Sequence, residues 1–171
     1  MTGAQLIQIM PLAGHRANLF LAYLNAAMAE FGINTPLRQA AFLAQVGHES
    51  GQLRYVRELA SGAAYEGRAN LGNVIAGDGV RFKGRGLLQV TGRANYAACG
   101  VALGLDLLAR PDLLEQTAYA CRSAGWFWQS RGLNGLADAD DQEKVTRRIN
   151  GGVNGLAERL ALYQTARKVL A

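Results

Sequence analysis

Helical periodicity, interrupted by a glycine-rich middle, is the feature of this sequence that most limits its possible folds. Residues 16–31 carry apolar side chains three or four positions apart, and Gly32 follows where such a helix would end. Thr35 and Pro36 then offer an N-cap and a proline at the first helical position. They precede an apolar segment that predicts a buried helix ending near residues 47–51.

The periodicity fades between Gly51 and Gly104. Glycine is frequent there, and residues 77–79 read Gly-Asp-Gly, which is a turn signal. We expect loops and a short hairpin in this middle region, with residues 81–90 partly extended. The glycines within residues 83–86 indicate close backbone packing or positive φ.

Helical patterns return after the middle region, and no repeat, linker or low-complexity segment separates them. Three further helices are expected, with the limits Pro111 to about Ser130 (closed by Gly132), Asp138 or Asp140 to Asn150, and about Asn154 onward. The fold class predicted is therefore mainly α, with an irregular or β-hairpin middle. Residues 1–171 are expected to form a single domain.

The bulk composition narrows the class of protein further. A chain of 171 residues, half of them apolar, is long enough for one domain with its own core. No run of eighteen apolar residues occurs, so no stable insertion into a membrane is expected. The N-terminus lacks a basic start followed by a long apolar run, which predicts synthesis in the cytosol without a secretory signal. Cys99 and Cys121 are interpreted as buried thiols, with a single bridge between them as the alternative.

The net charge of +5 attracts polyanions, so nucleic acid, anionic lipid and an anionic bacterial wall would all qualify as partners. The basic residues are scattered, however, with no run of five or more. Neither a phosphate-binding P-loop pattern nor an aromatic RNA-binding pattern is present. Nucleic acid is therefore not expected as a partner.

Glu49 is the first candidate for chemistry, because it ends the apolar helix just before Gly51 lets the chain turn away. An apolar environment disfavours the ionised form of a carboxyl group, as a general acid for glycoside cleavage requires. The alternative is a solvated carboxylate at a helix end. A zinc site of the H-E-x-x-H type is disfavoured, because Gln52 stands where the second histidine would be and His15 is the only other histidine. No metal or other cofactor is expected.

A glycosidase usually needs a second carboxylate, and an inverting one holds its two carboxyl groups about 6.5–9.5 Å apart. Glu58 and Glu66 both follow Glu49 in the irregular stretch, and spacing alone does not choose between them. For either residue the alternative is an ordinary surface glutamate.

The stretch KGRGLLQVTGRANY at residues 83–96 gathers amide and hydroxyl side chains that can match the hydroxyl and acetamido groups of a sugar. A structural hairpin with polar edges is the alternative interpretation. Trp126 and Trp128 are interpreted as core residues rather than sugar platforms. Asn150, followed by two glycines, is by itself an ordinary helix C-cap.

Taken together, these segments resemble the family 19 glycoside hydrolases, in the branch that contains phage endolysins and bacterial chitinase-like proteins. The segments that carry the resemblance are AFLAQVGHESG at 41–51, AYEGRANLGN at 64–73, RFKGRGLLQVTGRANY at 81–96 and RRINGGVNGLAERLALYQ at 147–164. The resemblance covers the chain from about Asn34 onward. It implies a mainly helical, lysozyme-like fold and metal-free hydrolysis with inversion at the anomeric carbon.

The resemblance also implies residue roles. Glu49 corresponds to the general acid, and Thr91 to a serine or threonine that helps hold the attacking water. The second carboxylate is Glu58 by the spacing of endolysin-like members and Glu66 by that of plant chitinases; we favour Glu58. The candidate substrate-binding residues are Tyr65, Glu66, Arg85, Gln89, Asn95, Tyr96, Asn150 and Arg159.

The function expected from these features is that of an endolysin, a monomeric peptidoglycan hydrolase without a separate wall-binding domain. It would be made in the host cytoplasm and would reach the periplasm and cell wall after holin-type release. A chitinase acting on β-1,4-linked N-acetylglucosamine polymers is the alternative, with the same residues and mechanism. A catalytically inactive sugar-binding module is a third hypothesis, which the intact Glu49 disfavours.

Overall fold

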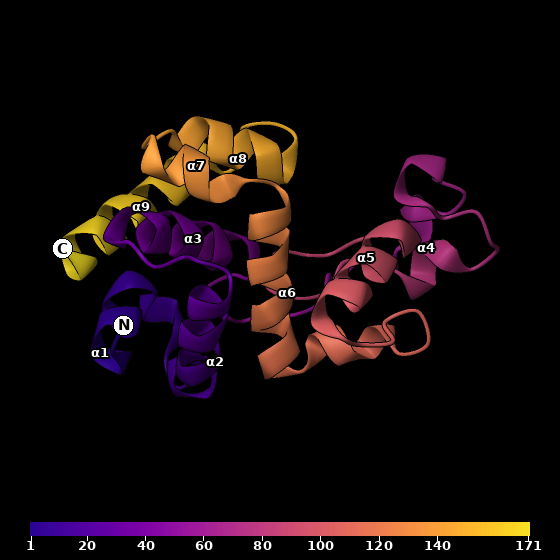
Figure 1. Cartoon of the computed structure of the whole chain (residues 1–171), viewed down its shortest axis with the longest axis horizontal. Helices are drawn as coiled ribbons and strands as arrows, with labels where there is room; N and C mark the ends of the chain where they lie inside the picture. The colour runs from indigo at the N-terminus through magenta and orange to yellow at the C-terminus, as the bar shows by residue number, and fades with distance from the viewer.

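The computed structural model describes all 171 residues, and nearly all of its regular structure is helical, as expected for a mainly α, lysozyme-like fold. Figure 1 shows a larger lobe formed by the N- and C-terminal helices and a smaller lobe formed by α4, α5 and the loops around them, with α6 standing between. The helices are α1 (Gly3–Ile9), α2 (Arg16–Glu30), α3 (Pro36–Glu49), α4 (Asp78–Arg81), α5 (Arg93–Leu103), α6 (Thr117–Ser130), α7 (Leu133–Asp138), α8 (Gln142–Asn150) and α9 (Leu156–Leu170). Short 3-10 helices are η1 (Pro11–Ala13), η2 (Ala63–Tyr65), η3 (Ala69–Leu71) and η4 (Pro111–Glu115).

The start of α3 follows the sequence signals closely. The Thr35 side chain accepts a hydrogen bond from the amide of Arg38, and Pro36 occupies the first helical position. The helix is buried from Ala40 to Gly47, so its path is fixed by packing on several sides. Its last residue is Glu49, which therefore sits at the end of a rigid, core-embedded element.

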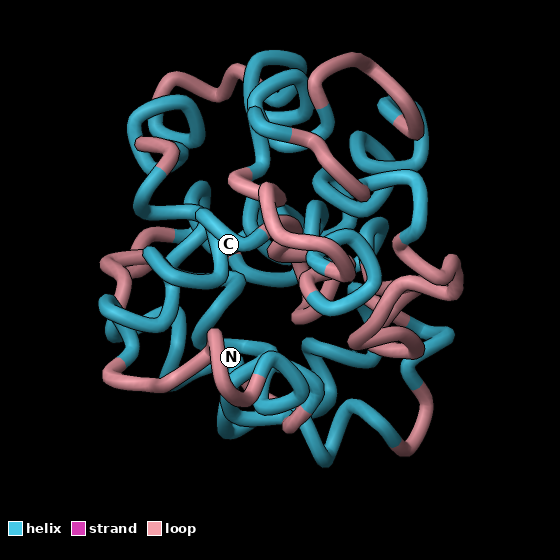
Figure 2. The backbone as a smooth tube through the Cα atoms, turned by 90° about the vertical axis from the view of Figure 1, so that its right-hand side faces the viewer, coloured by secondary structure: helices cyan, strands magenta, loops and turns pink.

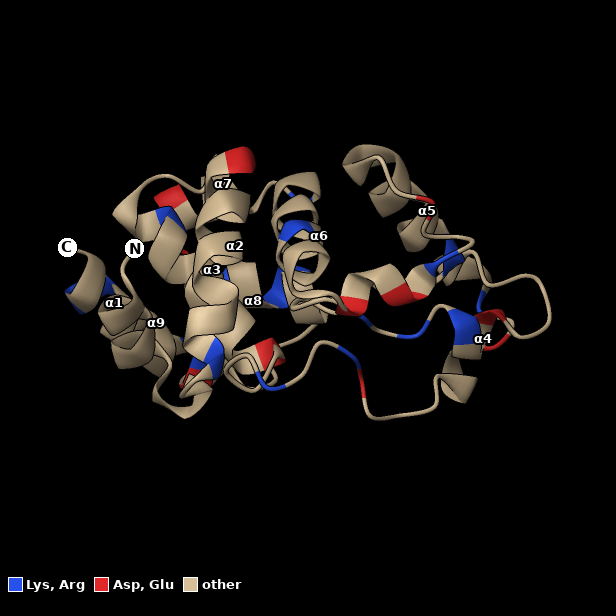
Figure 3. Cartoon of the chain, turned by 90° about the horizontal axis from the view of Figure 1, so that it is seen from below, with Lys and Arg blue, Asp and Glu red and all other residues tan.

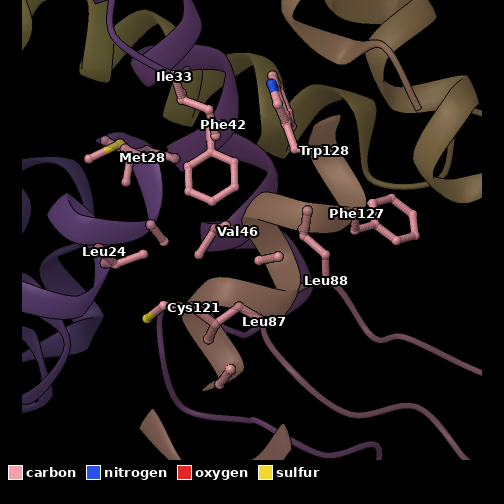
Figure 4. Close-up of a cluster of buried hydrophobic side chains, with 14 of the residues drawn as sticks. Leu24, Met28, Ile33, Phe42, Val46, Leu87, Leu88, Cys121, Phe127 and Trp128 are labelled. Carbon is pink, nitrogen blue, oxygen red and sulfur yellow. The ribbon is translucent and has the colours of Figure 1, made fainter. Parts of the chain in front are cut away.

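The core is built around α3. Phe42 and Val46 of this helix meet Leu24 of α2 and Trp128 of α6 (Figure 4). The rings of Phe42 and Trp128 pack edge to face with centroids 5.4 Å apart. The prediction that Trp128 is a core residue is confirmed, because its side chain has no exposed surface. 

Cys99 and Cys121 are free, buried thiols. Burial raises the pKa of Cys99 to about 12 and raises that of Cys121 as well, so neither thiol is reactive at neutral pH. The alternative of a bridge between them is not what the structure contains.

The middle region contains loops and short turns rather than a regular hairpin (Figure 2). Only isolated antiparallel bridges form, from Arg85 to Arg57 and to Val90. The expected positive φ is confirmed at Gly86, where φ is 81° and a Cβ would lie 2.4 Å from Oγ of Ser123.

Two sequence-based limits were wrong. Residues 111–130 do not form one helix, because Gln116 is extended and separates η4 from α6. The N-cap of α8 is neither Asp138 nor Asp140: Asp141 accepts the hydrogen bond from the amide of Lys144. Asp140 has a φ of 57° and instead binds the Tyr163 hydroxyl and Arg167. Helices α1, α4, α5 and α7 were not predicted.

Charged side chains of both signs occur in both lobes (Figure 3). None of the helices is long and apolar enough to cross a membrane.

Candidate active site

A cleft lies between the two lobes, and it has two halves that meet at Glu49, Gln89 and Thr91. The first half is walled by α6 and α8 on the larger lobe; besides the three shared residues it is lined by Leu71, Leu88, Val90, Asn95, Phe127, Arg131, Ile149 and Asn150. The second half extends along the chain that follows α3; besides the shared residues it is lined by Tyr55, Arg57, Glu58, Leu59 and Tyr65.

Glu49 is held by a hydrogen bond from a buried arginine. Arg159, on α9, donates from Nη2 to Oε1 of Glu49 over 2.5 Å and is itself 1% exposed. The Arg159 guanidinium also donates to Oε1 of Gln45 and to the carbonyl of Asn154. Gln45 in turn donates to the hydroxyl of Thr146 on α8. This buried chain of hydrogen bonds fixes one carboxyl oxygen of Glu49 and leaves Oε2 without a protein partner.

The neighbouring His48 ties the end of α3 to the start of α9. Its Nδ1 lies 2.8 Å from Oε2 of Glu158. The imidazole ring lies against Gly155, where a Cβ would come within 2.1 Å of the ring. The conformation of Gly155, with φ of 70°, also favours glycine. The junction that positions Glu49 thus depends on a residue without a side chain.

Glu58 is held by two donors. The amide of Gly84 donates to Oε1 over 2.7 Å, and the Tyr65 hydroxyl donates to Oε2 over 3.0 Å. The backbone reinforces this position, because the amide of Glu58 donates to the carbonyl of Gly84. Burial and the hydrogen bond to Glu58 raise the pKa of Tyr65, so the phenol stays protonated as a donor.

Gln89 and Thr91 form a tight polar turn beside the two glutamates. Gln89 has a φ of 53°, unusual for a residue other than glycine, and its Nε2 donates to the carbonyl of Gly86. The Thr91 hydroxyl donates to the carbonyl of Gln89 over 2.9 Å, which leaves the hydroxyl oxygen free to accept from a water molecule. Oε1 of Gln89 is buried without a partner.

Glu66 does not line the cleft. Its two carboxylate oxygens accept from the amides of Gly77 and Gly79, over 2.7 and 2.8 Å. Glu66 therefore fastens two loops of the smaller lobe together, and the structure separates it from Glu58, which lines the cleft with Glu49.

Three other predicted substrate-binding residues are placed in the interior. Arg85 is 9% exposed, and its guanidinium donates hydrogen bonds to Glu115, to the carbonyl of Arg81 and to the Tyr96 hydroxyl. Tyr96 is fully buried, and Arg159 contacts Glu49 from behind. These three side chains lie in the interior and do not line the cleft, and their role in substrate binding stays a prediction.

Tyr65, Gln89, Asn95 and Asn150 do line the cleft. Sequence reasoning missed Tyr55, Phe127 and Arg131 in the cleft wall. Phe127 and Arg131 are four residues apart on α6, and this i, i+4 spacing was the available signal that they share a face. No three His, Cys, Asp or Glu side chains gather closely enough to hold a metal ion.

Comparisons with known proteins identify the family and the fold that this chain shares. The chitinase class I family model matches residues 22–135. A glycosyl hydrolase family 19 domain-containing protein of Haemophilus influenzae is 34% identical, over 82% of this chain and 84% of that protein. An endochitinase of Arabidopsis thaliana is 35% identical over 78% of this chain, which spans only 46% of that protein.

Solved structures share the fold over 99% of this chain. Chitinase C from Streptomyces griseus superposes with a TM-score of 0.81 at 26% identity, covering 91% of that chain. A bacterial family 19 chitinase gives 0.80 at 27% identity and 94% coverage. A class IV chitinase from Zea mays gives 0.67 at 25% identity and 81% coverage.

Proposed function

The chain belongs to glycoside hydrolase family 19 and is a chitinase-like glycosidase; on this premise we propose that it is an endolysin that hydrolyses the β-1,4 glycosidic bonds of bacterial peptidoglycan with inversion. The observation that carries the proposal is that Glu49, Glu58 and Thr91 line one cleft. Oε2 of Glu49 has no protein partner, each carboxylate oxygen of Glu58 has a single protein donor, and the Thr91 hydroxyl oxygen is free to accept from water.

Glu49 acts as the general acid in this proposal. Because Arg159 occupies Oε1, the proton is carried on Oε2 and passes to the glycosidic oxygen as the bond breaks. The carboxylate that remains is stabilised by the charge-assisted hydrogen bond from Arg159. A fixed carboxyl group also avoids a reorientation step, since α3 and α9 already hold it.

Glu58 acts as the general base. Its carboxylate, oriented by Gly84 and Tyr65, accepts a proton from a water molecule. The same water donates its second hydrogen to the Thr91 hydroxyl, so that its lone pair is aimed at the anomeric carbon. Attack from the face opposite the leaving group gives an α-anomer from a β-linked substrate. Proton NMR of freshly released product should therefore show the α-anomer first; a β-anomer as first product would require a nucleophile or substrate assistance instead.

The choice of peptidoglycan rests on charge. The net charge of +5 favours encounter with an anionic wall. Chitinase activity is the second candidate, favoured by the printed descriptions of the similar plant and bacterial proteins as chitinases or endochitinases.

Two assays run side by side separate these functions. One follows the loss of turbidity of Gram-negative cells whose outer membrane has been permeabilised, and the other follows cleavage of chitin oligosaccharides. Faster specific action on cells supports the proposal, whereas activity on chitin oligosaccharides alone makes the protein a chitinase. Activity on neither would favour a sugar-binding module. Mass spectrometry of the digested wall then shows which sugar carries the new reducing end.

A further inference from the structure

The pairing of charges singles out one arginine of the cleft. Ten of the eighteen lysine and arginine side chains lie within 4.0 Å of a carboxylate oxygen. Only one of the remaining eight, Arg131, lines the cleft, because the other cleft-lining arginine, Arg57, pairs with Glu115. The eight without a carboxylate partner are Arg16, Arg54, Arg68, Arg81, Lys83, Arg131, Arg148 and Lys168.

Arg131 is held in place without using its hydrogen-bond donors. It caps the C-terminal end of α6, and its guanidinium lies over the ring of Phe127, with Cζ 4.2 Å from the ring centroid. The side chain of Phe127 is itself almost fully buried, so the stacking platform is fixed. No protein acceptor takes any of the five N–H groups that an arginine presents. The surrounding wall partly desolvates the guanidinium and lowers the pKa of Arg131, although the group stays a cation.

Arg131 shares its half of the cleft with the reacting centre. Glu49, Thr91 and Arg131 line this half together with Asn150, while Glu58 lines only the other half. A sugar chain that passes Glu49 would therefore extend past Arg131 on the side away from Glu58. The guanidinium stands beside the path of the glycan at a position other than the cleaved bond.

A guanidinium that is stacked on a fixed ring and keeps free, coplanar donors is suited to a carboxylate, which it binds through two parallel hydrogen bonds. Chitin offers no such group, since an N-acetylglucosamine polymer is neutral. Peptidoglycan does, because peptides attached to alternate sugars carry carboxylates. We propose that Arg131 forms an anion subsite that binds a carboxylate on a peptide stem and thereby favours substituted, anionic glycan over neutral glycan. This inference rests on the proposed function and names the residue that sets its substrate preference.

The test compares one glycan in two charge states. Soluble peptidoglycan strands with intact peptides are assayed beside the same strands after their carboxylates have been converted to amides with carbodiimide and ammonium. The quantity of interest is the ratio of kcat/KM for the native strands to kcat/KM for the amidated strands. Arg131→Gln removes the guanidinium, and Arg131→Lys keeps a positive charge without the planar fork. Lys168→Gln is the matched control, because this substitution removes the same unit of charge. Lys168 is exposed and lies on α9, outside the cleft.

We expect Arg131→Gln to lower this ratio about tenfold or more, mainly through KM for the native strands, since a charge-assisted pair contributes strongly to binding. Arg131→Lys should give an intermediate ratio, and Lys168→Gln the wild-type ratio. An equal ratio in wild type and Arg131→Gln, with native strands still cleaved, would overturn the subsite and leave the proposed function standing. Failure of the wild type to cleave native strands would overturn both. Thermal melting of each variant checks that it is folded.

Discussion

At the scale of single residues, the site separates two glutamates that are close in sequence. The carboxylates of Glu58 and Glu66 both accept hydrogen bonds from backbone amides. Each oxygen of both carboxylates has one protein donor, but Glu58 lines the cleft beside Glu49, whereas Glu66 lies outside the cleft and joins the loops at Gly77 and Gly79. We therefore propose a chemical role for Glu58 and a structural role for Glu66.

Substituting these two glutamates with glutamine should give different kinds of damage. Glu58→Gln should lower kcat by about 10²-fold or more with little change in melting temperature, because an amide cannot accept the proton of water. Glu66→Gln should lower stability by about 1–3 kcal/mol, because its NH₂ group would face an amide N–H. Steady-state kinetics and thermal unfolding measure both effects. A greater loss of kcat in a folded Glu66→Gln protein would move the base assignment to Glu66.

The sequence indicated the cleft residues that belong to specific motifs. Gln89, Thr91 and Asn150 were predicted and do line the cleft. Tyr96 was expected among the polar side chains of residues 83–96, but the chain becomes helical at Arg93 and Tyr96 lies in the core. Arg131 was missed because its i, i+4 spacing from Phe127 indicates only a shared face, whereas its importance depends on the buried ring that it stacks on and on the cleft beside it.

At the scale of elements, the position of Glu49, the proposed general acid, depends on how α3 meets α9. Their contact lies where His48 packs on Gly155 and bonds Glu158. Helix α3 is buried along most of its length and cannot move easily. A displacement of His48 at this junction would therefore move the carboxyl group of the neighbouring Glu49.

Replacing Gly155 with alanine should therefore harm both stability and activity. The new Cβ would meet the His48 ring at a position whose φ of 70° already disfavours alanine. Gly104→Ala is the matched control, since φ there is 69° and no atom lies within 4 Å of the added Cβ. Gly104→Ala should cost about 1 kcal/mol, from backbone strain alone, without loss of kcat. Urea unfolding should show a larger loss for Gly155→Ala, with a fall in kcat; equal effects of the two variants would argue against the junction.

Periodicity predicted α2 and α3 because their apolar residues recur regularly, Gly32 follows α2, and Thr35 and Pro36 begin α3. It missed α5, because alanines and Gly100 separate the few large apolar residues of this helix. The middle region could not be derived locally, because its loops are held by contacts distant in sequence. The hydrogen bond from Arg93 to Asp78 is one example, with the carboxylate almost fully buried and its pKa lowered to about 2.

At the scale of the whole molecule, two lobes of different construction meet along the cleft (Figure 1). The larger lobe provides Glu49 from a packed helix, and the chain that follows provides Glu58 and Thr91 from loops pinned by hydrogen bonds. The surplus of positive charge is spread over both lobes (Figure 3). It therefore acts as a long-range field rather than as one basic patch.

Salt should weaken the enzyme on whole walls more than on short neutral oligosaccharides. Attraction between the positively charged protein and an anionic wall is screened within about 8 Å at physiological ionic strength, whereas binding of a neutral chain in the cleft has no such term. Initial rates on both substrates between low and high salt test this. Equal salt sensitivity would show that net charge has no role in wall binding.

The central claim is that Glu49 donates the proton that breaks the glycosidic bond, and the most direct test is the hydrolysis rate of Glu49→Gln. Glutamine keeps the shape of the side chain and can still accept from Arg159, so the fold and melting temperature should be nearly unchanged. It cannot act as an acid, and the rate should fall by about 10²- to 10⁴-fold. A purified, folded Glu49→Gln protein that keeps more than about a tenth of the wild-type rate would contradict the account.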